Sequence, residues 1–440
     1  MADAPRAGAA PLRRGPRAAV LALAIAAGAL LLGSLLLHGL LEPQRASRFL
    51  LQRAGAALGL EIVATGRAEY RLRGTPTLVL RDVSVREPGA ARELAHADRV
   101  LLSVPWATIR ALGEVLDARR LELDAPRVDL AALGHWLDAR PPAAAPKLPT
   151  FADGIQVRDG VLLGDGWRVD GIALALPRLA DGEPLHARLQ ARYAAPPLAV
   201  PLSLSLALTD PGALLRGARS GFGASGRITV HREGEWAMPG WLLLSGPLRI
   251  GDGGLRLQPA RLGLAARWQS GDASLPFALG AHGALRYDGA TWLLADAGVA
   301  LRGRGDAARD PVPALRARGQ LALGRRLVLR LQGDIARWPQ AWPALPAPLD
   351  AVAAPMPFAL DYAGATDLGD VARLGLQRGA AALDARFRLG DVQAWLDDGR
   401  GNPLPPLDGR LRAPLLELDG ARLEGVDVVL DAPEVDDAAR

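Results

Sequence analysis

The sequence predicts a mainly β chain, in which an N-terminal transmembrane helix is followed by an elongated antiparallel β-sheet with a few short helices. Three observations predict this fold class. An uncharged apolar run occupies residues 18–41, short alternations of apolar and polar residues recur beyond it, and Asp-Gly pairs lie between many of them. Of the 440 residues, 50% are hydrophobic and 5% are aromatic, so we expect a large core of Leu, Val and Ala.

Residues 18–41 are predicted to form a membrane anchor. At ~1.5 Å per residue the run is long enough to cross a hydrocarbon layer of ~30 Å. The alternative is a cleavable signal peptide, but the apolar part of a signal peptide spans about 7–15 residues and ends at a small-x-small site. This run instead ends near His38 and Pro43. The arginines before it favour a cytoplasmic tail at residues 1–17, because a long downstream domain translocates largely regardless of its charge.

The rest of the chain is predicted to be a repetitive β body. Most apolar side chains in the strand candidates recur at every second residue, which gives a sheet with one apolar and one polar face. The strand candidates are residues 227–231, 248–250, 255–257, 284–287, 327–331, 385–389 and 426–430. Asp-Gly pairs suit hairpin turns because both residues tolerate a positive φ. They begin at Asp153, Asp159, Asp165, Asp170, Asp252, Asp288, Asp408 and Asp419. We expect other groups to cover the apolar face and shield it from water.

Helices and linkers interrupt this pattern in a few places. The helical candidates are residues 46–58, 106–116 and 390–397. Two Pro-rich stretches, 141–149 and 339–357, read as interruptions, and the first marks the main boundary. The expected organisation is a tail (1–17), an anchor (18–41), an N-terminal region (42–140), a linker (141–150), the repetitive β-strand body (151–430) and a C-terminal tail (431–440).

The residues needed for most catalytic chemistry are missing or scattered. The chain has no Cys, and its six His residues form no ligand pair at helical spacing. Residues 221–226 satisfy G-x-G-x-x-G, but they lead into a strand-like run, so we expect a loop there and no dinucleotide site. Irregular Asp-Gly spacing favours plain turns over calcium repeats. We therefore predict no catalytic, cofactor-binding or metal-binding residues, no cofactor and no enzymatic activity.

Charge does not favour a nucleic-acid partner. The formal net charge is +5, yet arginines alternate with acidic residues along the chain and Lys147 is the only lysine. A nucleic-acid-binding protein concentrates basic residues on one stripe or helix. The only dense basic cluster lies beside the apolar run, at Arg13, Arg14 and Arg17.

Residues 60–130 resemble the N-terminal region of the AsmA family. The resemblance is carried by a Thr65-Gly66 strand and by a P-x-L-x-L-x-D-V strand that matches Pro76, Leu78, Leu80, Asp82 and Val83. A strand, a short helix and an L-x-L-D-x-P-x-V-x-L strand follow within residues 97–130, and Gly134-His135-Trp136 is a looser match. Residues 411–430 look like the paired strands near the end of such proteins. About a quarter of the chain is covered.

The resemblance implies a curled, groove-like antiparallel sheet whose concave apolar face holds lipid acyl chains. It also implies an inner-membrane protein, single-pass, with its N-terminus in the cytoplasm and its bulk in the periplasm. The expected function is non-catalytic lipid binding or transfer for outer-membrane and envelope biogenesis, with phospholipid acyl chains and the inner membrane as partners. The alternative is a structural or assembly factor that acts through an envelope protein partner. No lipid-binding residue is assigned: Arg71 and Arg73 flank an apolar strand, but an ordinary solvated strand face explains them as well.

Overall fold

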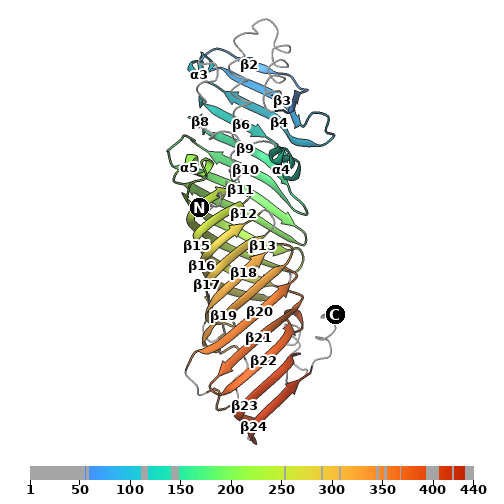
Figure 1. Ribbon diagram of the computed structural model, residues 1–440, viewed down its shortest axis with the longest axis vertical. Helices are drawn as coiled ribbons and strands as arrows, with labels where there is room; N and C mark the ends of the chain where they lie inside the picture. Colours follow the sequence, from blue (N-terminus) through green and yellow to red (C-terminus); the bar gives the residue numbers. More distant parts are fainter. Residues whose placement is uncertain are drawn as a thin grey trace, which may run out of the picture. The chain divides into compact units, whose positions relative to one another are not determined.

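A computed structural model of the chain has a mainly β fold (Figure 1). Its described residues are 55, 59–110, 117–139, 148–251, 254–288, 291–306, 309–342, 345, 347–350, 354–366, 368–392, 406–418 and 421–431. A mostly antiparallel sheet contains 22 of the strands, and β5 and β8 form a separate parallel pair. The chain divides into two compact units. Unit 1 comprises Met1–Ala195, Leu206–Gly221 and Leu248–Leu255, and unit 2 comprises Pro196–Ser205, Phe222–Pro247 and Arg256–Arg440.

The elements before residue 196 are β1 (Glu61–Ala64), β2 (Glu69–Arg71), β3 (Thr77–Arg86), β4 (Glu93–Ser103), α3 (Trp106–Arg110), β5 (Asp117–Ala118), β6 (Arg120–Asp124), β7 (Arg127–Asp129), α4 (Leu130–Asp138), β8 (Thr150–Phe151), β9 (Ile155–Leu163), β10 (Arg168–Leu176) and β11 (Leu185–Ala195). The later elements are β12 (Leu198–Leu208), α5 (Pro211–Leu215), β13 (Ser220–Arg232), β14 (Trp236–Gly251), β15 (Gly254–Ser270), β16 (Ala273–Tyr287), β17 (Trp292–Gly303), β18 (Ala314–Leu323), β19 (Leu327–Arg337), β20 (Met356–Gly364), β21 (Val371–Arg378), β22 (Ala381–Arg388), β23 (Asp408–Leu418) and β24 (Ala421–Leu430).

Unit 1 contains a mixed sheet. Strand β3 pairs with β1, β2 and β4, and β4 continues to β6 and β7, all in antiparallel register. Strand β9 then pairs in parallel with both β6 and β7, and β10 and β11 resume the antiparallel order. A parallel pairing needs a crossover connection, and α4 lies in the chain between β7 and β9. The antiparallel expectation is therefore corrected at β9.

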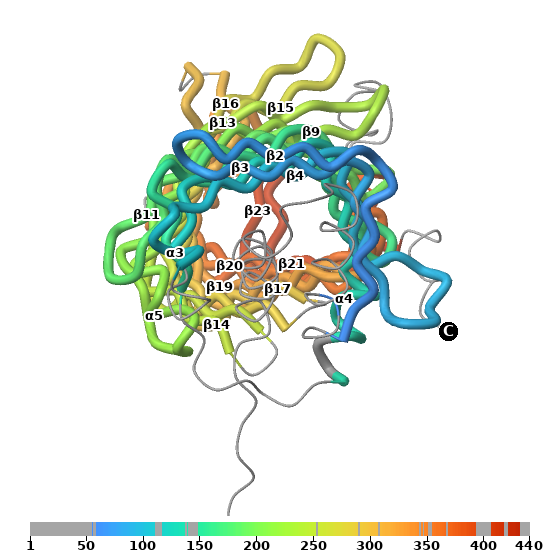
Figure 2. The backbone as a smooth tube through the Cα atoms, turned by 90° about the horizontal axis from the view of Figure 1, so that it is seen from above, coloured from blue at the N-terminus to red at the C-terminus, as the bar shows by residue number. Residues whose placement is uncertain are grey.

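Two short helices cover the apolar face of unit 1 near opposite ends of β4 (Figures 1 and 2). Near the C-terminal end, Ile109 of α3 packs with Leu102 and Leu121, and its side chain is 1% exposed. Near the N-terminal end, Leu133 and Trp136 of α4 pack with Leu60 and Leu94. Between them, strand β3 supplies the buried residues Leu78, Leu80 and Val83. These side chains therefore bury the part of the apolar face that β3, β4 and β6 form.

The buried carboxylate of Asp129 holds the start of α4. Its Oδ1 accepts a hydrogen bond of 2.9 Å from the Ala132 backbone N–H, and Arg92 forms an ion pair with Oδ2. Burial raises the pKa of Asp129, but the hydrogen bonds from backbone N–H groups and the Arg92 guanidinium together lower it below its usual value.

Replacing Asp129 with Ala is expected to destabilise the α4 region by about 1–2 kcal/mol, because a helix cap and an ion pair are lost. Since the folded-state pKa is lowered, this stabilisation is present at neutral pH and is lost as the pH falls through that pKa. Asp129→Asn keeps a capping oxygen and should retain part of the stability without the acid dependence. Hydrogen exchange of residues 127–138 at neutral and acidic pH measures both effects. Identical exchange in all three proteins would contradict the assignment.

Unit 2 contains an antiparallel meander from β16 to β24, in which each strand pairs with the next along the chain (Figure 1). Directly opposed residues share a face of the sheet. In β19, Leu327, Leu329, Leu331 and Ile335 lie on one face, while Arg330, Gln332 and Asp334 lie on the other. The alternation predicted for residues 327–331 is confirmed, and it extends to the end of the strand.

The other strand predictions are also confirmed, with small changes at the ends. The segments 227–231, 248–250, 255–257, 284–287, 327–331 and 426–430 lie within strands, while Leu389 begins a helical turn instead of ending β22. Three of the Asp-Gly predictions are wrong: Asp159 and Asp170 lie inside β9 and β10, and Asp408 begins β23. Asp159 has φ 54°, and the strand register shifts next to Asp170. The Asp-Gly pairs at Asp159 and Asp170 therefore form β-bulges. Asp165 and Asp288 lie at hairpin connections, as predicted.

The helix predictions are partly confirmed. Trp106–Arg110 is helical, and so are the described residues 389–392, whereas α4 and α5 were not predicted. The anchor (18–41), most of the 46–58 helix, most of the 141–149 linker and nearly all of the C-terminal tail lie outside the described residues. Within the residues that the structure does describe, none of the helices has the length and hydropathy of a membrane span. The described part of the 339–357 stretch forms no strand before Met356, as predicted.

Candidate functional site

The histidines of the described chain are dispersed. Five histidines lie on five different elements, at His96, His135, His186, His231 and His282. Among the described residues there is no group of three or more His, Asp and Glu side chains that could hold a metal ion.

The glycines of residues 221–226 lie inside β13, so the expected loop is wrong. Gly226 has φ 154°, and a Cβ placed there would lie 2.1 Å from the Ser203 backbone oxygen. Glycine is therefore required at Gly226 by a close approach of the backbone of β12. The motif does not precede a helix, which is the context that a dinucleotide site needs.

The polar face of unit 1 carries a cluster of paired charges. Arg99 donates to Asp124 at 2.9 Å and to Glu122 at 3.2 Å. Arg158 lies 3.0 Å from Asp124, and Arg120 lies 2.6 Å from Glu122. Burial raises the pKa of Asp124, but its hydrogen bonds with Arg99 and Arg158 outweigh this and lower it. The cluster is explained by mutual pairing across β4, β6 and β9.

The two arginines considered as lipid-facing candidates lie at one edge of unit 1. Arg71 is exposed on β2 opposite Thr77, which alternates with the buried Leu78 of the apolar face. Arg73 is exposed in the connection between β2 and β3. Arg71 is thus on the polar side of the sheet, where an ordinary solvated strand residue is expected.

In unit 2, one continuous face of the sheet is apolar, and we call it the apolar face. The register connects five rows of side chains across the strands. The rows include Leu279–Leu301–Leu315–Ile335–Met356, Val299–Ala317–Gly333–Phe358–Leu376–Leu383, Leu331–Leu360–Leu374, Leu294–Leu321–Leu329–Tyr362–Ala372, and Tyr287–Trp292–Leu323–Leu327. From β16 to β22 there are six strand spacings, which at ~4.8 Å each make a surface about 29 Å wide.

One end of the apolar face is covered by the connector between β19 and β20. Trp338 and Leu345 pack on the cluster of Ala317, Ile335, Met356 and Phe358. Further along, Leu349 packs against Ala381, Ala413 and Leu416. Two backbone oxygens anchor this segment: Leu349 O accepts from Arg378 Nε at 2.7 Å, and Ala347 O accepts from the Glu417 N–H at 2.8 Å. Much of the middle of the apolar face, including Leu329, Leu331, Leu360 and Leu374, is half-buried.

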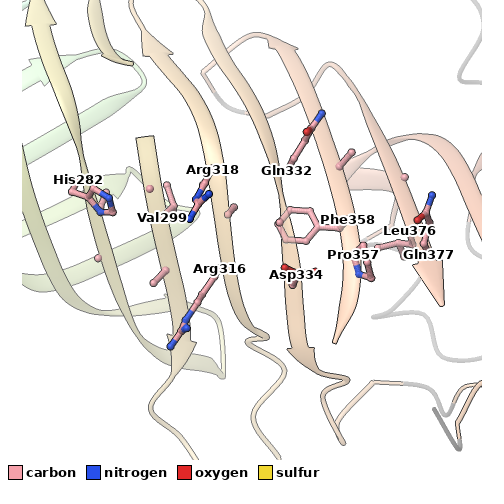
Figure 3. Close-up of a pocket in the computed structure, with 18 of the residues that line it drawn as sticks. His282, Val299, Arg316, Arg318, Gln332, Asp334, Pro357, Phe358, Leu376 and Gln377 are labelled. Carbon is pink, nitrogen blue, oxygen red and sulfur yellow. The ribbon is translucent and has the colours of Figure 1, made fainter. Parts of the chain in front are cut away.

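The opposite, polar face of unit 2 has a shallow groove of about 1270 Å³ that crosses β15 to β22 (Figure 3). Two rows of polar-face residues border it, with Gly and Ala between the larger side chains. The larger lining residues are Arg261, Leu262, His282, Val299, Arg316, Arg318, Gln332, Asp334, Pro357, Phe358, Leu376, Gln377 and Asp384. The His282 imidazole lies over Gly298, because a Cβ at Gly298 would be 2.2 Å from His282 Cε1. This groove offers both polar and apolar contacts.

Comparison with known proteins identifies no relative of this chain. No family model, no curated protein and no solved structure matches the chain. The class of protein that the described residues define is therefore a mainly β protein with a long, mostly antiparallel sheet.

Proposed function

We propose that this chain is a non-catalytic lipid-binding or lipid-transfer module of the bacterial envelope, anchored in the inner membrane by residues 18–41. The observation that carries the proposal is the apolar face of unit 2, with its five rows of aliphatic and aromatic side chains. The apolar run at the N-terminus and the AsmA-like segments 60–130 and 411–430 support the same function.

Acyl chains would bind this face through burial of hydrocarbon. Each buried CH₂ group contributes ~0.8 kcal/mol. Binding needs no polar catalytic group, and it would bury the remaining exposed surface of the leucines of β19 to β21. The charged side chains remain on the polar face in water, so a lipid held here avoids the cost of desolvating them.

A charge placed in the middle of the apolar face tests the proposal. The full chain is purified and the phospholipid that co-purifies is quantified by mass spectrometry. We expect bound lipid in the parent protein and at least about tenfold less in Leu360→Arg, because a guanidinium would meet the acyl chain. The matched control is Gln332→Arg on the polar face of the adjacent strand, which should retain its lipid.

Loss of folding is distinguished from loss of the site by a second variant. Leu331→Trp keeps the apolar face apolar but fills the space that an acyl chain would occupy. Circular dichroism checks that all variants keep their strands. Absence of phospholipid from the parent protein, together with no exchange of labelled lipid from vesicles, contradicts the proposed function.

A second function, an assembly factor that binds an envelope protein, is favoured by β24. Among the described strands β24 pairs only with β23, and Leu423, Val428 and Val429 are 43%, 38% and 70% exposed. An exposed strand edge with apolar residues can accept a strand from another chain. Cross-linking in cells from a photoreactive residue at position 429 tests this function. A single stoichiometric protein adduct would favour it over lipid binding.

A further inference from the structure

The two ends of the apolar face differ in exposure. At the end covered by the connector, Ile335 and Met356 are 7% and 3% exposed. At the other end, beside the turns that connect β16 to β17 and β18 to β19, Trp292 and Leu323 are 40% and 48% exposed. These two residues are directly opposed in the sheet, so they form one exposed apolar site. The apolar face is thus closed at one end of its strands and open at the other.

Aromatic side chains line the open end. The rings of Tyr287 and Trp292 stack, with centroids 4.6 Å apart and an interplanar angle of 29°. The register continues this row from Trp292 to Leu323 and Leu327. Tyr and Trp combine an apolar ring with a polar group, and they favour the boundary between hydrocarbon and water.

Basic residues lie next to this aromatic row. Arg325 and Arg326 occupy the turn between Leu323 and Leu327, and both are exposed. Arg326 Nη2 also donates to the Ala363 backbone oxygen at 2.7 Å, which fixes its side chain beside β20. Guanidinium groups are well suited to bind phosphate.

We propose that the end formed by Tyr287, Trp292, Leu323 and Leu327 is the portal through which a phospholipid reaches the apolar face. The acyl chain enters along β18 and β19, and the phosphate stays at the Arg325–Arg326 turn. This inference rests on the proposed lipid-binding function, and it adds the place of entry and the orientation of the bound lipid.

The dimensions of β19 agree with this orientation. From Leu327 to Ile335 there are eight residue steps, or about 27 Å at ~3.4 Å each. An acyl chain occupies about half of the ~30 Å hydrocarbon core of a bilayer, or about 15 Å. A chain that enters at Leu327 therefore ends near Leu331, before it reaches the row that the connector covers.

Photoreactive phospholipids test the orientation in the full-length protein. Two phosphatidylglycerol probes are compared, one with a diazirine next to the headgroup and one with a diazirine at the end of an acyl chain. We expect the first to label peptides that contain Trp292 or Leu323, and the second to label peptides around Leu331 and Leu360. The reverse pattern overturns the inference but leaves lipid binding intact, whereas absence of labelling on the apolar face overturns the proposed function itself.

Blocking the portal tests the route. Because the chain contains no cysteine, Leu323→Cys introduces a single thiol that can be coupled to a polyethylene glycol maleimide after folding. The matched control is Gln320→Cys, which places the same group on the polar face of the same strand. We expect uptake of fluorescent phosphatidylglycerol from vesicles to slow about tenfold after coupling at residue 323 and to stay unchanged after coupling at residue 320. Equal rates in both conjugates overturn the inference.

Discussion

Replacing Ile109 with Ala is expected to destabilise the closed end of β4 in unit 1 by about 2–5 kcal/mol. The Ile109 side chain is 1% exposed and lies in a cluster with Leu102, Val104, Leu121 and Phe151. Truncation removes buried methyl groups and leaves a cavity, because the surrounding strands hold the cluster in place. Since α3 has only five residues, its position depends on this packing more than on its own hydrogen bonds.

Hydrogen exchange of β4 and β6, read peptide by peptide, measures the effect. A matched control is Leu163→Ala on β9, where a comparable side chain is 41% exposed and should cost well under about 1 kcal/mol. If both substitutions accelerate exchange equally, burial of Ile109 does not hold α3 against the sheet.

Replacing Gly319 with Ala is expected to disrupt the centre of the unit 2 sheet. Gly319 has φ 154°, and a Cβ placed there would lie 1.9 Å from the Arg330 backbone oxygen. Arg330 is on the paired strand β19, so the clash involves backbone, which a rotamer change cannot relieve. We expect a loss of at least about 2–3 kcal/mol, from strain and from the hydrogen bonds that must lengthen.

The control for Gly319 is Gly280→Ala on β16, where nothing lies within 4 Å of the added Cβ. Thermal unfolding followed by circular dichroism, together with hydrogen exchange of β18 and β19, compares the two variants. Wild-type exchange in Gly319→Ala would show that the two strands can separate at this point without cost.

The strands of unit 2 could be predicted because their alternation is nearly complete. In β19, leucines recur at every second position from Leu327 to Leu331, and from Arg330 to Asp334 every second residue is polar. One apolar sheet face follows from this pattern alone. Which of its ends is open does not, because this depends on strand pairing and on where the β19–β20 connector packs. Trp338, Leu345 and Leu349 are scattered among prolines, and they show no periodicity that would place them on the sheet.

The Asp-Gly errors have a physical cause. A positive φ at Asp159 serves a bulge inside β9 as well as it would serve a turn. Whether the pair forms a bulge or a turn depends on pairing with another strand, and the residues around Asp159 alone do not show that pairing. Helix α4 was missed for a related reason. It is only nine residues long, and the packing of Leu133 and Trp136 with Leu60 and Leu94 supplies much of its stability.

The meander of unit 2 has a consequence for how the chain grows and folds. Because every strand from β16 to β23 pairs with its immediate successor, contacts are local and loop-closure costs are small. Hairpins can add to the sheet one after another as the polypeptide is synthesised, without waiting for distant segments. By the same logic, duplication or deletion of a hairpin would lengthen or shorten the sheet while its remaining neighbours keep their register.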